Sequence, residues 1–124
     1  MLEYGLFTKL YGESLSYDDI DIYIAERGWQ DWMEQFNDDG VSIILKNIFN
    51  LAKMSLKEIR RAEKLTRRAF YKIYYIPVRT LENWEYEERK LTDYDKMLIC
   101  YTVFVKYINS KAIIHCEVKE DCKE

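Results

Sequence analysis

The sequence predicts an all-α fold, and three observations support this prediction. Glycine and proline are scarce, with Gly 4 and Pro 1 in 124 residues, so few tight turns interrupt the chain. Apolar side chains recur at helical spacing, whereas the strict alternation typical of a half-buried strand is nearly absent. Residues that cap helices stand before several of these apolar stretches. A chain of this length can fold as one compact unit without disulfides or metal.

Residues 1–54 are predicted to form an N-terminal helical extension. The Ser16 hydroxyl is expected to start a helix that ends near Arg27, with acidic residues, among them Asp18 and Asp19, in its first turn. Four apolar residues then recur at i, i+3, i+4 and i+7, which predicts a second helix with a core-facing stripe of Trp29, Trp32, Met33 and Phe36. Residues 37–40 are expected to form a turn, and residues 41–54 a third helix.

Residues 55–108 are predicted to carry three short helices and one long one. Ser55 and Glu58 form a capping box, Thr66 caps the next helix, and Pro77 suits the first turn of the third. The last helix is expected to run from Thr92 to about Ile108, before a charged tail over residues 109–124. In the helix that starts at Pro77 the apolar residues are Leu81 and Trp84. The opposite, outward face then holds Val78, Arg79, Thr80, Glu82 and Asn83.

Charge divides the chain as well. The formal net charge is only −3, but residues 53–90 hold 11 basic and six acidic residues, a net charge of +5. Residues 1–52 hold three basic and ten acidic residues, a net charge of −7. Basic residues on short helices favour contact with nucleic acid, so the charge pattern indicates a nucleic-acid partner for the second half of the chain.

This basic segment contains the stretches LTRRAF (65–70), IPVRTLENWE (76–85) and RK (89–90). Together they resemble the Cro and lambda-repressor-like, or Xre-type, helix-turn-helix proteins over about residues 55–108. The resemblance implies a helix-turn-helix bundle of about five helices, and a double-stranded DNA partner whose major groove receives the second helix of the pair. It implies base contacts from Val78, Arg79, Thr80 and Asn83. It implies phosphate contacts from Arg67, Arg68, Arg89 and Lys90. A homodimer is expected, because one recognition helix reads too few base pairs for useful specificity.

The sequence departs from the family's pattern at four positions. Tyr71 stands where the family has alanine, Tyr75 and Glu87 stand where it has glycine, and Arg67 replaces a common glutamine. A non-glycine residue at position 75 has to adopt a left-handed backbone at a steric cost. Large amphipathic tyrosines are also enriched at protein interfaces. A protein interface is therefore a second expectation for Tyr71, Tyr75 and Tyr86.

Other classes of function find little support in the sequence. We expect no enzyme, because the chain has neither a phosphate-binding glycine loop nor a plausible carboxylate pair. The spacing of His115 and the three cysteines is not that of a zinc motif, so neither a metal nor a cofactor is expected. An odd cysteine count fits reduced thiols. The sequence shows no signal peptide and no apolar run long enough to span a membrane, so a cytoplasmic protein is expected.

Two functions therefore remain. The first is a small sequence-specific DNA-binding transcriptional regulator of the phage or mobile-element type. The second is a protein-interaction module on a repurposed helix-turn-helix scaffold, such as an anti-CRISPR-type inhibitor of a nucleic-acid enzyme. In that alternative the acidic N-terminal helices, with Asp18, Asp19 and Asp21, would occupy a basic channel of the partner. The first is favoured because Arg79 and Asn83 are residue types that read guanine and adenine.

Overall fold

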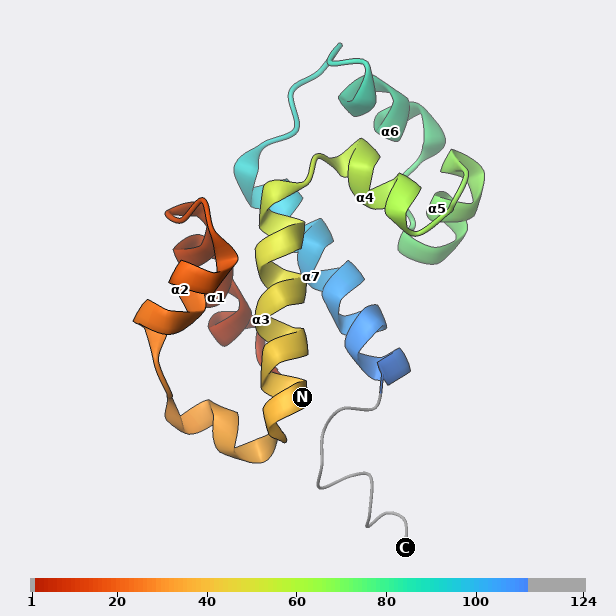
Figure 1. Ribbon diagram of the computed structural model, residues 1–124. Coiled ribbons are helices and arrows are strands. Elements are labelled where there is room, and N and C mark those ends of the chain that lie inside the picture. The colour runs from red at the N-terminus through yellow and green to blue at the C-terminus, as the bar shows by residue number, and fades with distance from the viewer. Residues whose placement is uncertain (1, 112–124) are drawn as a thin grey trace, which may run out of the picture.

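The computed structural model describes residues 2–111, and all regular structure within them is helical (Figure 1). The predicted all-α class is confirmed. None of the helices in this part of the chain is long and apolar enough to cross a membrane. The elements are α1 (Tyr4–Leu15), α2 (Ile20–Arg27), the 3-10 helix η1 (Asp31–Gln35), α3 (Asp38–Lys53), α4 (Leu56–Ala62), α5 (Arg67–Tyr74), α6 (Val78–Glu85) and α7 (Asp93–Lys111).

The larger core surrounds α3, which runs through the middle of the molecule between α7 and the α1–α2 pair (Figure 1). Ile44 and Ile48 of α3 are completely buried there. Helix α1 also packs on α7, where the ring centroid of Phe7 lies 5.3 Å from that of Phe104. Burial of each such side chain contributes about 1.5–3 kcal/mol, so this core is the main source of stability. We refer to α1, α2, α3 and α7 as the larger bundle.

A second, smaller core lies among α4, α5 and α6. Its buried residues are Leu56, Phe70 and Leu81, one from each helix. The partly buried side chains of Tyr74 and Ile99 pack against both cores and join them. We call residues 55–91, which carry these three helices, the basic unit. Helix α7, which the sequence pattern groups with residues 55–108, lies against α1 and α3 and meets the smaller core through Ile99.

Three of the helices begin where capping residues predict them. In each case a side-chain oxygen of the cap accepts a backbone N–H from the first turn of the helix. The caps are Ser55, Thr66 and Thr92. The prediction of Ser16 as a helix start is wrong, because Ser16 lies at the end of α1, and the Asp19 carboxylate caps α2 instead. The predicted capping box is confirmed, because the Glu58 carboxylate also accepts the backbone N–H of Ser55 at 2.8 Å.

The prediction of a second helix from Trp29 to Phe36 is wrong in extent. Gly28 has a φ of 70° and redirects the chain, and Gln30 is extended, so only the short η1 forms. Met33 and Phe36 are buried as expected, and Trp32 is partly buried. Trp29 is 63% exposed and does not join the core, because it precedes the helical turn that was expected to orient it.

Two further differences lie in the first half of the chain. Residues 37–40 do not form a turn, because the Asn37 side chain accepts the backbone N–H of Gly40 and thereby starts α3. Asp38 and Asp39 then lie at the positive end of the helix dipole, where carboxylates are favourable. Helix α1 was not predicted. Its N-cap, Glu3, makes no capping hydrogen bond, so the sequence lacks the usual start signal.

Candidate nucleic-acid interface

Helices α5 and α6 are joined by a tight turn. Tyr75 has a left-handed backbone there, at the position where Xre-type helix-turn-helix proteins have glycine. Its φ is 60° and its ψ is 30°, and its N–H donates to the carbonyl of Tyr71 at 2.7 Å. Pro77 then acts as the N-cap of α6, which begins one residue later than predicted. Glu87, at the other position where glycine was expected, also has a positive φ, of 61°.

The outer face of α6 carries the four predicted base contacts. Arg79 is exposed, and Val78, Thr80 and Asn83 are half-buried. Arg79 and Asn83 are separated by one helical turn and so share a face. Leu81, by contrast, is completely buried in the smaller core. The side chains of α6 thus divide into an inner apolar anchor and an outer polar face.

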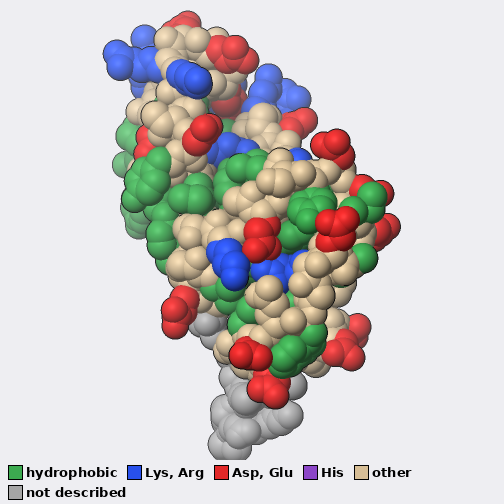
Figure 2. All heavy atoms as spheres, turned by 90° about the vertical axis from the view of Figure 1, so that its left-hand side faces the viewer, with side chains coloured by type: hydrophobic (Ala, Val, Ile, Leu, Met, Phe, Trp, Pro, Cys, Tyr) green, Lys and Arg blue, Asp and Glu red, His purple; other side chains and the backbone are tan. Residues whose placement is uncertain are grey.

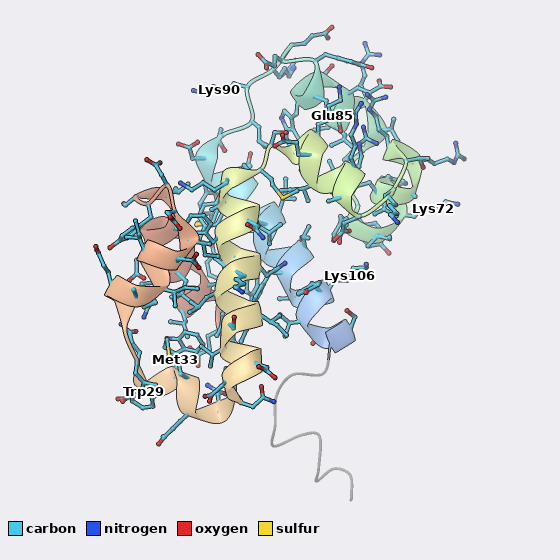
Figure 3. All side chains as sticks on the ribbon, in the orientation of Figure 1. Trp29, Met33, Lys72, Glu85, Lys90 and Lys106 are labelled. Carbon is cyan, nitrogen blue, oxygen red and sulfur yellow. The ribbon has the colours of Figure 1, made fainter. Side chains whose placement is uncertain are left out.

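The chain after α6 folds back over the end of that helix. The carbonyl oxygen of Asn83 accepts the N–H of Glu88 at 2.8 Å and that of Arg89 at 3.3 Å. Arg89 is therefore held close to the base-contact candidates. Lys90 follows directly, and Figure 3 shows it extending outward on the side of the basic unit opposite Lys72. Arg68, Arg89 and Lys90 are all exposed, as phosphate contacts have to be.

Arg67, the fourth predicted phosphate contact, is held by the protein itself. Its guanidinium pairs with the Glu85 carboxylate at 3.1 Å, donates to the Tyr86 hydroxyl at 3.0 Å and lies over the Tyr86 ring. A phosphate contact from Arg67 stays a prediction and would use its remaining N–H donors. The exposed Tyr86 ring thereby has a partner within the basic unit.

The buried carboxylate of Glu85 is a feature that the sequence did not predict. Its side chain is completely buried, and Arg60 of α4 holds both oxygens, at 2.7 and 2.9 Å. Arg60 also donates to the carbonyl of Leu65 at 3.0 Å. Burial alone would raise the pKa of Glu85, but the hydrogen bonds and charges of Arg60 and then of Arg67 outweigh it and lower the pKa. One ion-pair cluster therefore ties α4, α5 and α6 together.

Acidic and basic side chains mix on the surface. Figure 2 shows several Lys and Arg side chains at the end of the molecule that the basic unit occupies, with some Asp and Glu beside them, and both kinds of side chain over the rest of this face. Asp18, Asp19 and Asp21 are all exposed near the start of α2. Asp19 has a structural task, because its carboxylate caps that helix at 2.8 Å. The three aspartates predicted to contact a protein therefore lie at another helix than α6, which carries the predicted base contacts.

The three candidate interface tyrosines are all exposed. Tyr75 is 78% exposed, and its ring meets that of Tyr71 edge to face, with the centroids 6.4 Å apart. Tyr86 lies beside Arg67, which belongs to the ion-pair cluster of the smaller core. Their exposure is compatible with the protein interface expected for them, which stays a prediction.

Replacing Tyr75 with Gly is expected to raise the free energy of unfolding by roughly 0.5–1 kcal/mol. A left-handed backbone is costly for tyrosine and free of strain for glycine, while the exposed ring buries little apolar surface. Urea denaturation measures the difference. Tyr71→Gly, in the interior of α5, is the matched control and is expected to lose about 1 kcal/mol. Loss of stability in Tyr75→Gly would mean that the contact between the two rings outweighs the backbone strain.

The described residues contain no cluster placed to bind a metal ion, and their one cysteine is a buried thiol. Within residues 2–111 no group of three or more His, Cys, Asp or Glu side chains is placed to hold a metal ion. Burial, only partly offset by Lys96 and Tyr11, raises the pKa of the Cys100 thiol to about 11, so this thiol is protonated at neutral pH. His115, Cys116 and Cys122 lie outside the described residues.

Comparison with known proteins assigns this chain to no family. Neither a family model, nor a curated protein, nor a solved structure matches this chain.

Proposed function

We propose that this chain is a small sequence-specific DNA-binding transcriptional regulator of the phage or mobile-element type. It reads double-stranded DNA through a helix-turn-helix made of α5, the turn at Tyr75 and α6. The observation that carries the proposal is the division of α6 into a buried anchor at Leu81 and an outer face with Arg79 and Asn83 one turn apart. Such a division lets one face of a helix pack on its own domain while the opposite face enters the major groove.

The residue types on this face match the chemistry of base edges. Arginine donates two hydrogen bonds to O6 and N7 of guanine, and asparagine pairs with N6 and N7 of adenine. The Thr80 hydroxyl can donate or accept, and the Val78 side chain suits contact with a thymine methyl group. A site read by α6 is therefore expected to contain guanine opposite Arg79 and adenine opposite Asn83.

The exposed cations around α6 supply the sequence-independent part of binding. Arg68, at the start of α5, and Arg89 and Lys90, beyond the end of α6, flank the reading face. Such cations neutralise phosphates and release counterions, so binding weakens steeply with salt. A homodimer would place two copies of α6 in successive major grooves, with half-sites about one helical turn apart.

The test is selection from a randomised duplex DNA pool at two salt concentrations, with the enriched sequences read out. A short palindrome and a steep loss of affinity with salt are expected. Arg79→Ala should then cost about 1–3 kcal/mol and relax the preference at one base pair of each half-site. Lys46→Ala removes an exposed cation of α3 outside the basic unit and should leave the preference unchanged. Enrichment of no sequence, or an Arg79→Ala variant with the parent's preference, would refute the assignment.

A second candidate, a protein-interaction module on the same scaffold such as an anti-CRISPR-type inhibitor, has one observation in its favour. Ile22 of α2 and Trp29, which follows α2, are 50% and 63% exposed, and Asp18 and Asp21 near the start of the same helix are exposed as well. Exposed apolar residues within an acidic surface suit a basic protein partner. Enrichment of no DNA sequence would favour this second candidate over the first.

A further inference from the structure

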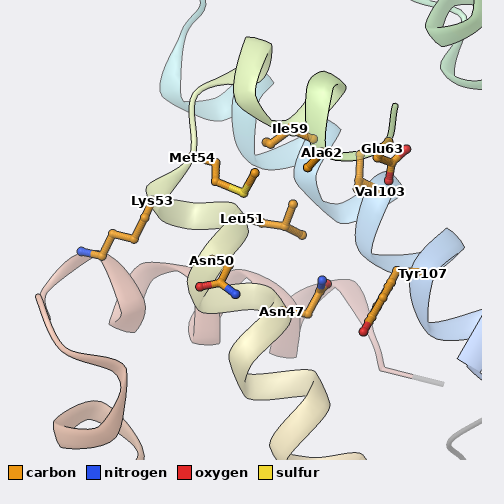
Figure 4. A pocket seen from close by; sticks show the side chains of 10 residues that line it. All are labelled: Asn47, Asn50, Leu51, Lys53, Met54, Ile59, Ala62, Glu63, Val103 and Tyr107. Carbon is orange, nitrogen blue, oxygen red and sulfur yellow. The ribbon is translucent and has the colours of Figure 1, made fainter. Parts of the chain in front are cut away.

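A cleft of about 500 Å³ lies where the larger bundle meets the basic unit, between α3, α4 and α7 (Figure 4). This volume falls in the range of sites that take small organic ligands. Its walls are mostly apolar and come from all three helices and the segment after α3: Leu51, Met54, Ile59, Ala62 and Val103. None of the residues assigned to DNA in this chain lines the cleft, so it is a separate site.

One polar atom in the cleft has an unmet requirement. The side-chain oxygen of Asn47 is buried and has no hydrogen-bond partner among residues 2–111. Buried acceptors are nearly always paired, because an unpaired one has lost its water without compensation. Figure 4 shows the Asn47 side chain directed from α3 toward α7, in the gap that Tyr107 borders. This oxygen has almost no accessible surface, so a ligand in the cleft reaches it only when the Asn47 side chain turns toward the cleft, and the ligand must then supply an N–H or O–H donor.

The charges at the cleft favour a cation. Two of its lining residues are charged, Lys53 and Glu63. The Lys53 side chain points away from the other lining residues in Figure 4, and its ammonium lies 5.3 Å from the centroid of the Phe49 ring. The Glu63 carboxylate remains at the cleft, where one of its oxygens accepts the Tyr74 hydroxyl at 2.8 Å. A carboxylate can accept several hydrogen bonds, so this contact leaves capacity for a ligand.

We propose that this cleft binds a small amine with an apolar body, whose N–H groups reach Asn47 and Glu63 while its hydrocarbon part packs between Met54, Ile59 and Val103. Glu63 also links the cleft to α5 through Tyr74, whose side chain packs against both cores, so an occupant contacts a residue bonded to the junction of the two cores. Any effect of a cleft ligand on DNA affinity would depend on the proposed function. Binding of the amine to the cleft does not depend on that function, and it is measured without DNA.

The experiment titrates the full chain with phenethylamine, phenethyl alcohol and hydrocinnamate, which share a phenyl body and differ in charge. Amide chemical shifts are followed by NMR up to about 10 mM, because a ligand of this size binds weakly. The amine is expected to bind most tightly, the alcohol more weakly, and the anion not at all. The shifted amides should cluster in α3, α4 and the middle of α7. Equal affinity for the three probes, or shifts scattered over the surface, would overturn the proposal.

Two variants separate the roles of the polar groups. Glu63→Gln keeps an acceptor for Tyr74 but removes the charge, and is expected to weaken the amine about tenfold while sparing the alcohol. Glu88→Gln, an exposed carboxylate elsewhere in the basic unit, is the matched control and should bind like the parent. Asn47→Leu should weaken both probes and raise the melting temperature, because it removes a buried unpaired acceptor. Unchanged amine affinity in both Glu63→Gln and Asn47→Leu would show that only water occupies the polar end of the cleft.

Discussion

Replacing Glu85 with Ala is expected to lower the free energy of unfolding by about 3–5 kcal/mol. The carboxylate is completely buried and receives hydrogen bonds from Arg60 and Arg67. Its removal leaves the guanidinium of Arg60, whose side chain is only 11% exposed, without a countercharge in the interior. Because this cluster joins α4, α5 and α6, the loss falls on the whole basic unit. Urea denaturation followed by circular dichroism measures it.

The same carboxylate gives the prediction a second readout, the dependence of stability on pH. Its pKa is lowered in the folded protein, so the ion pair contributes fully above the unfolded value of 4.5 and is lost as the pH falls through the folded value. The parent should therefore lose stability on acidification below about pH 4.5, and Glu85→Ala should lose less over the same range. Glu88→Ala, an exposed carboxylate three residues along, is the control and should change stability by less than about 0.5 kcal/mol.

A double variant shows whether the charge or the packing matters. Arg60→Met combined with Glu85→Leu replaces the ion pair with apolar side chains and is expected to recover most of the lost stability, because such replacements are often neutral. If Glu85→Ala alone were as stable as the parent, water would have to reach Arg60. The ion pair would then contribute little to the basic unit.

The helix starts show how far local sequence determines this fold. Ser55, Thr66 and Thr92 start helices as predicted, because a cap is a contact between residues three apart and its signal is present in the sequence. At Asn37 the sequence predicts a turn, but the residue caps α3, since asparagine and aspartate serve turns and caps equally well. Helix α1 has no side-chain cap, and it is held by packing on α3 and α7, which no local pattern reports.

The candidate site divides in the same way. The outward placement of Arg79 follows from helical spacing around Leu81, so the sequence alone predicts it. The pairing of Arg60 with Glu85 joins residues 25 apart, and in the sequence both are ordinary charged positions of surface helices. The cleft beside Asn47 depends on how α4 is placed against α3 and α7. Such features arise from tertiary geometry, and only the structure reveals them.

Replacing Phe70 with Ala is expected to unfold α5 and α6 while leaving the larger bundle folded. Phe70 is completely buried in the smaller core, where its ring centroid lies 4.6 Å from that of Tyr74. Truncating a buried phenylalanine costs about 3–5 kcal/mol. Among residues 2–111 the smaller core has only Leu56 and Leu81 as other buried members, so apart from the ion-pair cluster at Glu85 and partly buried neighbours α5 and α6 have little to hold them. The larger core contains none of the buried residues of α5 and α6 and should persist.

Hydrogen exchange resolves the two outcomes, because local unfolding removes amide protection only where structure is lost. In Phe70→Ala, protection should disappear from α5 and α6 and persist in α3 and α7. The control is Phe104→Ala, which makes the same truncation in the larger core and should remove protection throughout residues 2–111, because α1, α3 and α7 meet there. Uniform loss of protection in Phe70→Ala would show that the contacts of Tyr74 and Ile99 with both cores make the two units one cooperative domain. Confinement of the loss would instead mean that the DNA-reading surface can unfold and refold on a bundle that stays intact.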